Sequence, residues 1–237
     1  MSQENRTEEN SVKKSEQSGF ENDKFYKFAR GKGIMNLPNK LTISRMVMIP
    51  LFALMFYLTF TAHFFVALAV FAAASLTDLF DGKIARKYNL VTNLGKFLDP
   101  IADKVLVSTA FILLLTKAWV FTGFLGSWAL IVAGCGVALI LAREIIISGF
   151  RMVAADAGVV IAADKFGKYK TVFQDASVVV LLISAGITEL DAGTAAQVVN
   201  YIGLVLFAVA IVLTVLSGIN YIAVSYTHLT LPTILRV

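Results

Sequence analysis

The chain has 237 residues, of which 57% are hydrophobic and 16% are charged, and its mean hydropathy is +0.75. This composition excludes an ordinary soluble domain of the same size and predicts an all-α, polytopic membrane protein. The formal net charge of +5 does not predict nucleic-acid binding. The basic residues cluster beside the apolar segments, where orientation in a membrane already accounts for them.

The two ends of the chain differ from its apolar middle. Residues 1–34 are polar and form an extension whose first part we expect to be disordered. Its basic, aromatic end suits either an interfacial segment or a solvated linker, and without a signal-peptide pattern we expect the N-terminus to stay uncleaved and untranslocated. Residues 35–224 form the membrane domain. Residues 225–237 lack periodicity, and we expect an unstructured tail that could be foreign to the native protein.

Cysteine and histidine are too scarce to build a site. Cys135 is the only cysteine, which excludes a disulfide framework, and its apolar surroundings predict a small buried hydrophobe. The two histidines, His63 and His228, fall in a predicted turn and in the tail. We therefore expect neither a histidine metal site nor a catalytic triad.

The number of membrane spans follows from the lengths of the uncharged runs. Positions 46–77 contain no Asp, Glu, Lys or Arg. At about 1.5 Å per residue this run is too long for one span of about 30 Å and too short for two full spans. Both spans must therefore include polar ends, and we place them near 41–60 and 63–83 with a tight turn between them. A third span starts near Phe97, and the next three lie near 127–147, 171–188 and 194–216.

The charged residues of the loops predict the orientation in the membrane. Basic residues follow the second and fourth spans, whereas the alternate loops hold only Lys117 and then none. The positive-inside rule therefore places both termini on the cytoplasmic side of the cell membrane.

Four aspartates lie near the ends of two neighbouring predicted spans. Asp78 and Asp81 are spaced i,i+3, and Asp99 and Asp103 are spaced i,i+4, so each pair shares one face of a helix. They could be interfacial residues neutralised by nearby lysines and arginines. Carboxylates at membrane depth are costly unless paired or metal-bound, however, and four at this spacing favour a functional site.

The chemistry of four carboxylates points to metal ions. An oxygen-only cluster selects hard divalent cations such as Mg²⁺ or Mn²⁺, and four acids exceed what one Mg²⁺ usually takes from protein. Two such ions can clamp a phosphoryl group during an in-line displacement. Gly82 and Ala85 lack bulk, which would let a nucleotide approach the helix.

These residues resemble a known family signature. The pattern Asp78-x₂-Asp81-Gly82-x₂-Ala85-Arg86-x₈-Gly95-x₃-Asp99-x₃-Asp103 is similar to that of the CDP-alcohol phosphotransferases. The resemblance implies a homodimer of six-transmembrane-helix bundles with two divalent metals, which moves a substituted phosphate from a CDP-linked donor to an alcohol and releases CMP. It implies metal ligands at Asp78, Asp81, Asp99 and Asp103, a catalytic base at Asp103, and donor-binding residues at Asn39, Thr42, Gly82, Ala85 and Arg86.

Further segments resemble the phosphatidylglycerophosphate synthase branch, and the likeness extends from about Met35 to Tyr221. These segments are Leu37–Arg45, Gly95–Lys104, Arg143-Glu144 with Gly149–Arg151, and Gly167–Thr171. This implies CDP-diacylglycerol as the donor and sn-glycerol 3-phosphate as the acceptor. An acceptor with its own phosphate needs a cationic pocket, and Arg143, Arg151 and Lys168 are cytoplasmic-side cations from the later helices. Taken singly, each could equally serve orientation and solvation.

Two alternatives remain open. The same family chemistry could serve another acceptor, such as phosphatidylglycerol or inositol phosphate. A different class of protein, a cation transporter, could also use intramembrane acids to bind its ion. It would have no evident need for Gly82, Ala85 and Arg86.

Overall fold

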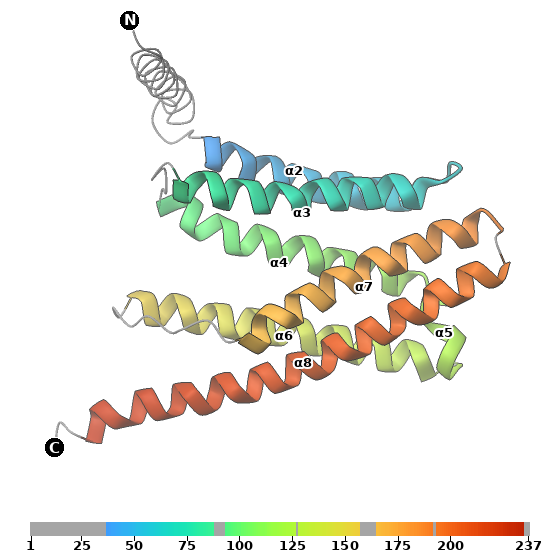
Figure 1. Ribbon diagram of the computed structural model, residues 1–237. Helices are drawn as coiled ribbons and strands as arrows, with labels where there is room; N and C mark the ends of the chain where they lie inside the picture. Colours follow the sequence, from blue (N-terminus) through green and yellow to red (C-terminus); the bar gives the residue numbers. More distant parts are fainter. Residues whose placement is uncertain (1–36, 88–92, 127, 157–164, 192, 235–237) are drawn as a thin grey trace, which may run out of the picture. The chain divides into compact units, whose positions relative to one another are not determined.

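The computed structural model describes residues 37–87, 93–126, 128–156, 165–191 and 193–234 (Figure 1). The N-terminal extension and the predicted connection around residues 88–92 lie outside this part of the chain. Every regular element in the described residues is an α-helix, which confirms the all-α prediction. The helices are α2 (Leu37–Tyr57), α3 (His63–Lys87), α4 (Asn93–Thr116), α5 (Trp119–Leu125), α6 (Trp128–Asp156), α7 (Lys165–Glu189) and α8 (Gly193–Ile234).

A proline lies at the start of α2, and a tight turn separates α2 from α3. Pro38 is the second residue of α2, where its missing N–H breaks no helical hydrogen bond. The predicted tight turn separates α2 from α3, and Ala62 adopts a positive φ of 66° there. Glu189 Oε1 accepts a hydrogen bond from the Ala62 backbone N–H at 3.0 Å and lies 3.1 Å from Nδ1 of His63. The turn is therefore held by a side chain from α7.

The helix ends differ from the predicted spans at several points. The short helix α5 was not predicted, because its seven residues read as part of a continuous apolar run. It stops at Gly126, whose φ of 59° suits glycine. The expectation of an unstructured tail is wrong for residues 225–234, which continue α8. Between Gly218 and Pro232 the sequence contains no glycine or proline that would end a helix.

The chain divides into two compact units. The first combines the start of α2, the end of α3 and the start of α4, within residues Met1–Val47 and Ser75–Ala102. The second contains Met48–Ala74 and Asp103–Val237. Each unit is described separately below.

Aromatic side chains form the core of the second unit. Phe52 and Phe56 of α2 are fully buried, and their rings lie 5.8 Å from Phe71 and 5.3 Å from Phe64 of α3, respectively. Phe207 of α8 packs against other rings of the same core, from α4 and α5. Tilted and edge-to-face pairs of this kind add about 0.5–1.5 kcal/mol each beyond their buried area. These ring contacts join α2 to α3 and α8 to α4 and α5.

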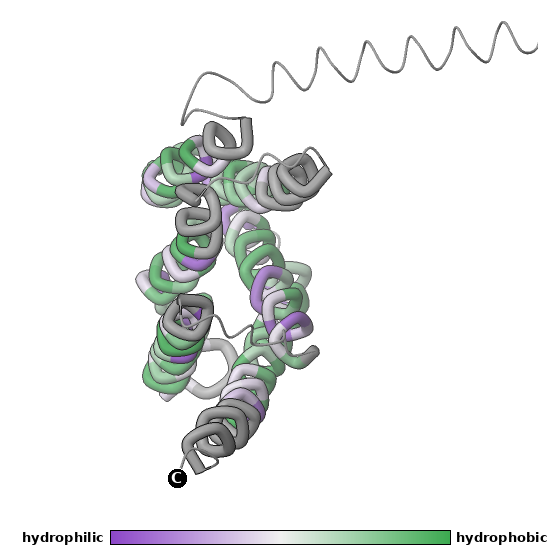
Figure 2. The backbone as a smooth tube through the Cα atoms, turned by 90° about the vertical axis from the view of Figure 1, so that its left-hand side faces the viewer, coloured by the Kyte–Doolittle hydropathy of each residue, from purple (hydrophilic) through white to green (hydrophobic). Residues whose placement is uncertain are grey.

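Apolar side chains also cover much of the outside. Figure 2 shows hydrophobic colouring over most of the described backbone. Three of the described helices are long and apolar enough to cross a membrane, over Trp128–Arg151, Phe166–Glu189 and Gly193–Tyr221. Large apolar side chains are exposed along α6, Ile131 and Ile145 among them, as expected for a lipid-facing surface. Cys135 belongs to this surface, so the expectation of a buried cysteine is wrong.

Glycine permits the closest approach of α7 and α8. A Cβ atom on Gly203 would lie 2.7 Å from Cδ2 and 3.3 Å from the backbone nitrogen of Leu181, which is fully buried. Leu181 therefore has little room to move aside. The two helices pack at a distance that only glycine allows at position 203.

We predict that Gly203→Ala lowers the free energy of unfolding by roughly 1–3 kcal/mol, because the added methyl group overpacks this contact. Thermal unfolding in detergent measures the change. Gly134→Ala is the matched control, since a Cβ there meets nothing within 4 Å and alanine favours the helix. Equal melting temperatures for the two variants would contradict the close approach.

Candidate active site

Except for Asp103, the predicted donor and metal residues lie on segments of the first unit. Asn39 and Thr42 belong to the start of α2, Asp78 and Asp81 to the end of α3, and Asp99 to the start of α4. Thr42 is buried, with 1% of its surface exposed. The side chains of Asn39, of residues 78–100 and of Asp103 lie outside the description. At the level of the backbone, the structure thus places Asn39, Thr42, Asp78, Asp81 and Asp99 on helices of one compact unit, and Asp103 in the other.

Both aspartate pairs lie within continuous helices, as predicted. Asp78 and Asp81 are followed by the last turns of α3, which also carry Gly82, Ala85 and Arg86. Asp99 and Asp103 are one turn apart on α4. Among the side chains that are described, no three His, Cys, Asp or Glu residues gather into a metal site. The four aspartates are not part of that set.

Asp103 begins the segment of α4 that belongs to the second unit. The next residue, Lys104, lines a small cavity together with Glu144 of α6 and with Thr171 and Gln174 of α7. Its volume of about 20 Å³ is room for about one water molecule. The residue that follows the predicted base therefore lies beside polar groups of α6 and α7.

A buried ion-pair cluster joins α6, α7 and α8. The Lys170 ammonium group pairs with Oε1 of Glu144, and Nη1 of Arg143 lies 3.3 Å from the same oxygen. Nη2 of Arg143 donates a hydrogen bond to Oγ of Ser217 at 2.5 Å. The Lys170 side chain is 1% exposed, and those of Arg143 and Glu144 are 12% and 16% exposed. Two cations share one acid, so these three residues carry a net charge of +1.

Small residues let the neighbouring helices close over Arg143. A Cβ atom on Gly167 of α7 would lie 3.7 Å from Nη2 of Arg143 and 3.6 Å from Oγ of Ser217. A Cβ on Gly218 of α8 would lie 3.8 Å from Cγ of Arg143. All three distances are ordinary van der Waals contacts, so side chains larger than alanine at either position would push against the Arg143 side chain.

The other two predicted acceptor-binding residues lie nearer the surface. Arg151 is exposed about two turns beyond Arg143 on α6, and its guanidinium carbon lies 5.8 Å from the ring centre of Tyr221. Lys168 is exposed and directly follows Gly167, which approaches Arg143. The structure thus buries Arg143 and leaves Arg151 and Lys168 accessible to solvent or a ligand.

Sequence reasoning did not assign Lys170, Glu144 or Ser217 to the site. Glu144 interrupts an apolar run, and this was the available signal, whereas Lys170 stands in a basic stretch with Lys165 and Lys168 that gave none. Pairing them required knowing that α6 and α7 pack side by side at these positions. Nothing in the sequence distinguishes Ser217 from other serines in apolar helices.

The chain is similar to a known protein family over most of its length. The family profile described as CDP-alcohol phosphatidyltransferase matches residues 35–216. Among curated relatives is the CDP-diacylglycerol–glycerol-3-phosphate 3-phosphatidyltransferase of Rickettsia typhi, which is 37% identical over 196 residues. The alignment covers 81% of this chain and 98% of the relative.

The relatives of the same name from Shigella flexneri serotype 5b and Escherichia coli K12 are each 38% identical over 196 residues. Both alignments cover 82% of this chain and 97% of the relative. The family generally uses divalent metal ions and consists of polytopic membrane enzymes. On this evidence the chain belongs to the CDP-alcohol phosphatidyltransferase family.

Proposed function

We propose that the protein transfers the phosphatidyl group of CDP-diacylglycerol to sn-glycerol 3-phosphate, giving phosphatidylglycerophosphate and CMP. The observation that carries this choice is the similarity to relatives named for this reaction along nearly their whole length. The cluster around Arg143 adds a physical reason, since an acceptor with its own phosphate needs a cation within reach.

The four aspartates fit a divalent-metal site by the chemistry of their donors. Asp78, Asp81, Asp99 and Asp103 offer only carboxylate oxygens, which suit two Mg²⁺ or Mn²⁺ ions. When bound, such ions neutralise the pyrophosphate of the donor and stabilise the charge that develops on the attacking and leaving oxygens. Each helix contributes two of the acids, so α3 and α4 would both face the donor.

The transfer then needs a base and a nucleotide site. Asp103 takes the proton of the glycerol 1-hydroxyl, whose oxygen forms the new bond to the phosphatidyl phosphorus. The bond from that phosphorus to the oxygen of CMP breaks, and CMP leaves with the electron pair. Asn39, Thr42, Gly82, Ala85 and Arg86 hold the CDP part of the donor, with Gly82 and Ala85 leaving room beside α3.

Arg143, Arg151 and Lys168 hold the acceptor phosphate in this proposal. Arg143 alone would be neutralised by Glu144, with which it pairs. Lys170 pairs with the same carboxylate, so Glu144 is shared between two cations, and Arg143, Glu144 and Lys170 together carry a net charge of +1. Lys170 and Glu144 are therefore positioning residues that act through Arg143.

The setting in the membrane is part of the proposal. Six helices, α2, α3, α4, α6, α7 and α8, would cross the bilayer and pack as a homodimer. The basic loops would lie on the cytoplasmic side with both termini and the active site. The acyl chains of CDP-diacylglycerol would remain among membrane lipids while its pyrophosphate reaches α3 and α4.

We expect the purified protein, given CDP-diacylglycerol, Mg²⁺ and radiolabelled sn-glycerol 3-phosphate, to form labelled phosphatidylglycerophosphate and CMP in equal amounts. Parallel reactions contain phosphatidylglycerol or inositol phosphate as the acceptor. CMP release with either competitor but no labelled lipid from glycerol 3-phosphate would refute the proposed acceptor.

Asp81→Asn should reduce CMP release by at least about 10³-fold, because a neutral amide cannot replace a metal-binding carboxylate. Asp156→Asn, at the last residue of α6 and outside the motif, is the matched control and should retain activity. Gel filtration in detergent checks that both variants fold. An active Asp81→Asn enzyme would contradict the metal assignment.

Lys170→Met should raise the KM for glycerol 3-phosphate about tenfold, equivalent to about 1.4 kcal/mol, with a smaller change in kcat. The substitution removes the net positive charge of the cluster. In the double variant Glu144→Gln/Lys170→Met that charge is restored, and the KM should return toward the wild-type value. If the ion pair were merely structural, the double variant would bind the acceptor no better than Lys170→Met.

A further inference from the structure

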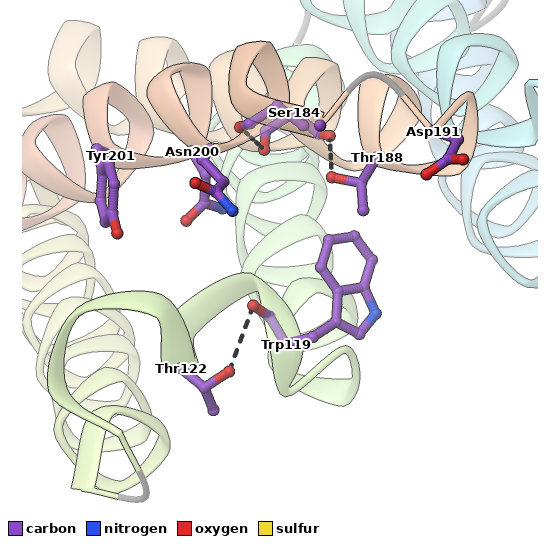
Figure 3. Close-up of a pocket in the computed structure, with 10 residues that line it drawn as sticks. Trp119, Thr122, Ser184, Thr188, Asp191, Asn200 and Tyr201 are labelled. Atoms are coloured by element: carbon purple, nitrogen blue, oxygen red, sulfur yellow. Dashed lines mark hydrogen bonds between the residues drawn. The ribbon is translucent and has the colours of Figure 1, made fainter.

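A second cavity lies at the other end of the long helices, where α7 turns into α8 (Figure 3). Its volume is about 440 Å³. Side chains from the α7–α8 turn form one wall, and Trp119 and Thr122 of α5 face them from the other side. Along α7, Thr188 is 18 residues from Lys170, or about 27 Å. This cavity is therefore separate from the proposed acceptor site.

Three polar side chains of the cavity donate hydrogen bonds to backbone carbonyl oxygens of the protein. Oγ of Ser184 donates to the Ala196 carbonyl oxygen at 3.1 Å, and Oγ1 of Thr188 donates to the Ser184 carbonyl oxygen at 2.8 Å. Nδ2 of Asn200 donates to the Val120 carbonyl oxygen at 3.0 Å. A hydroxyl group has a single hydrogen to donate. Ser184 and Thr188 therefore offer the cavity only acceptor oxygens, while the Asn200 and Gln197 amides offer an acceptor oxygen and remaining N–H groups.

The charge and the aromatic rings of the cavity favour binding of a cation. Asp191 is exposed and lines the cavity, while no lysine or arginine appears among its described lining residues. Trp119, 43% exposed, turns its indole ring into the space between α5 and the α7–α8 turn, and Tyr201 borders the same space. A carboxylate and aromatic rings that line one cavity can bind a cation by ion pairing or by cation–π contact.

We propose that this cavity binds a primary ammonium group, presented by the headgroup of an aminophospholipid such as phosphatidylethanolamine. An ammonium group has three N–H donors and no acceptor, which matches the Asp191 carboxylate and the hydroxyl oxygens of Ser184 and Thr188. A quaternary ammonium group has no N–H to donate and fits this lining less well. The cavity lies at the ends of the candidate spans Phe166–Glu189 and Gly193–Tyr221, at the level where lipid headgroups lie.

Fluorescence of Trp119 provides the test. The chain has two tryptophans, so Trp128→Phe leaves Trp119 as the only one. We titrate this variant in detergent with dioctanoyl phosphatidylethanolamine and, separately, with dioctanoyl phosphatidylcholine, which differs only by three methyl groups on nitrogen. We expect a saturable change in emission with the ethanolamine lipid and at least about tenfold weaker binding of the choline lipid.

Asp191→Asn in the same background should weaken binding of the ethanolamine lipid at least about tenfold. Asparagine tolerates the positive φ of 59° at this position, so the turn is preserved. Glu189→Gln is the matched control, because it removes a carboxylate two residues away that contacts Ala62 and His63 instead. It should leave binding unchanged.

Soluble ethanolamine distinguishes a lipid-borne ammonium group from a free one. Binding at least about tenfold weaker than that of the lipid supports the headgroup, whereas equal binding would overturn the lipid as the source. No saturable change with either amine, or equal responses to the two lipids, would overturn the ammonium site. If Trp128→Phe does not fold, retention of the two lipids by the wild-type and Asp191→Asn proteins in native mass spectrometry decides between the same outcomes. Transferase activity is not part of this readout, so the test is independent of the proposed reaction.

Discussion

Hydrocarbon penalises any ionised side chain that cannot reach water or an opposite charge, and the polar groups of this chain are arranged under that constraint. Lys170 is almost completely buried and pairs with Glu144, which also accepts Arg143. At the other end of α7, Glu189 lies against His63 and the turn that begins α3. Between these contacts the helices meet through aromatic rings and glycines, Gly203 among them, that need no polar partner.

The same constraint explains how much of the fold could be predicted from the sequence. An uncharged run between Arg45 and Asp78 that is too long for one span and too short for two required a turn near Ala62, and the structure has that turn. The bounds of the later helices were less predictable, because α6 and α7 extend past the apolar part into residues that could also have been loops. Helix α5 was missed because hydrophobicity alone does not show where an apolar run bends.

The candidate site, too, could be predicted from the sequence only in part. The placement of each aspartate pair on one helix could be predicted, because residue spacing along a helix is a local property that sequence determines. The contacts of Lys170 and Ser217 could not, because these residues come from α7 and α8 and reach Glu144 and Arg143 of α6 only through packing. Cys135 shows the reverse error: an apolar neighbourhood predicts burial in a soluble protein, whereas a membrane helix places apolar residues outside as well.

The central claim is that α3 and α4 together hold divalent metal ions with their four aspartates. It is tested most directly by anomalous diffraction from crystals of the protein grown with Mn²⁺ and CDP-diacylglycerol. The account predicts two anomalous peaks, each within coordination distance of carboxylates from both helices, with the donor pyrophosphate beside them. Density for the nucleotide without a metal at Asp78, Asp81, Asp99 or Asp103, or metal bound only elsewhere in the chain, would contradict it.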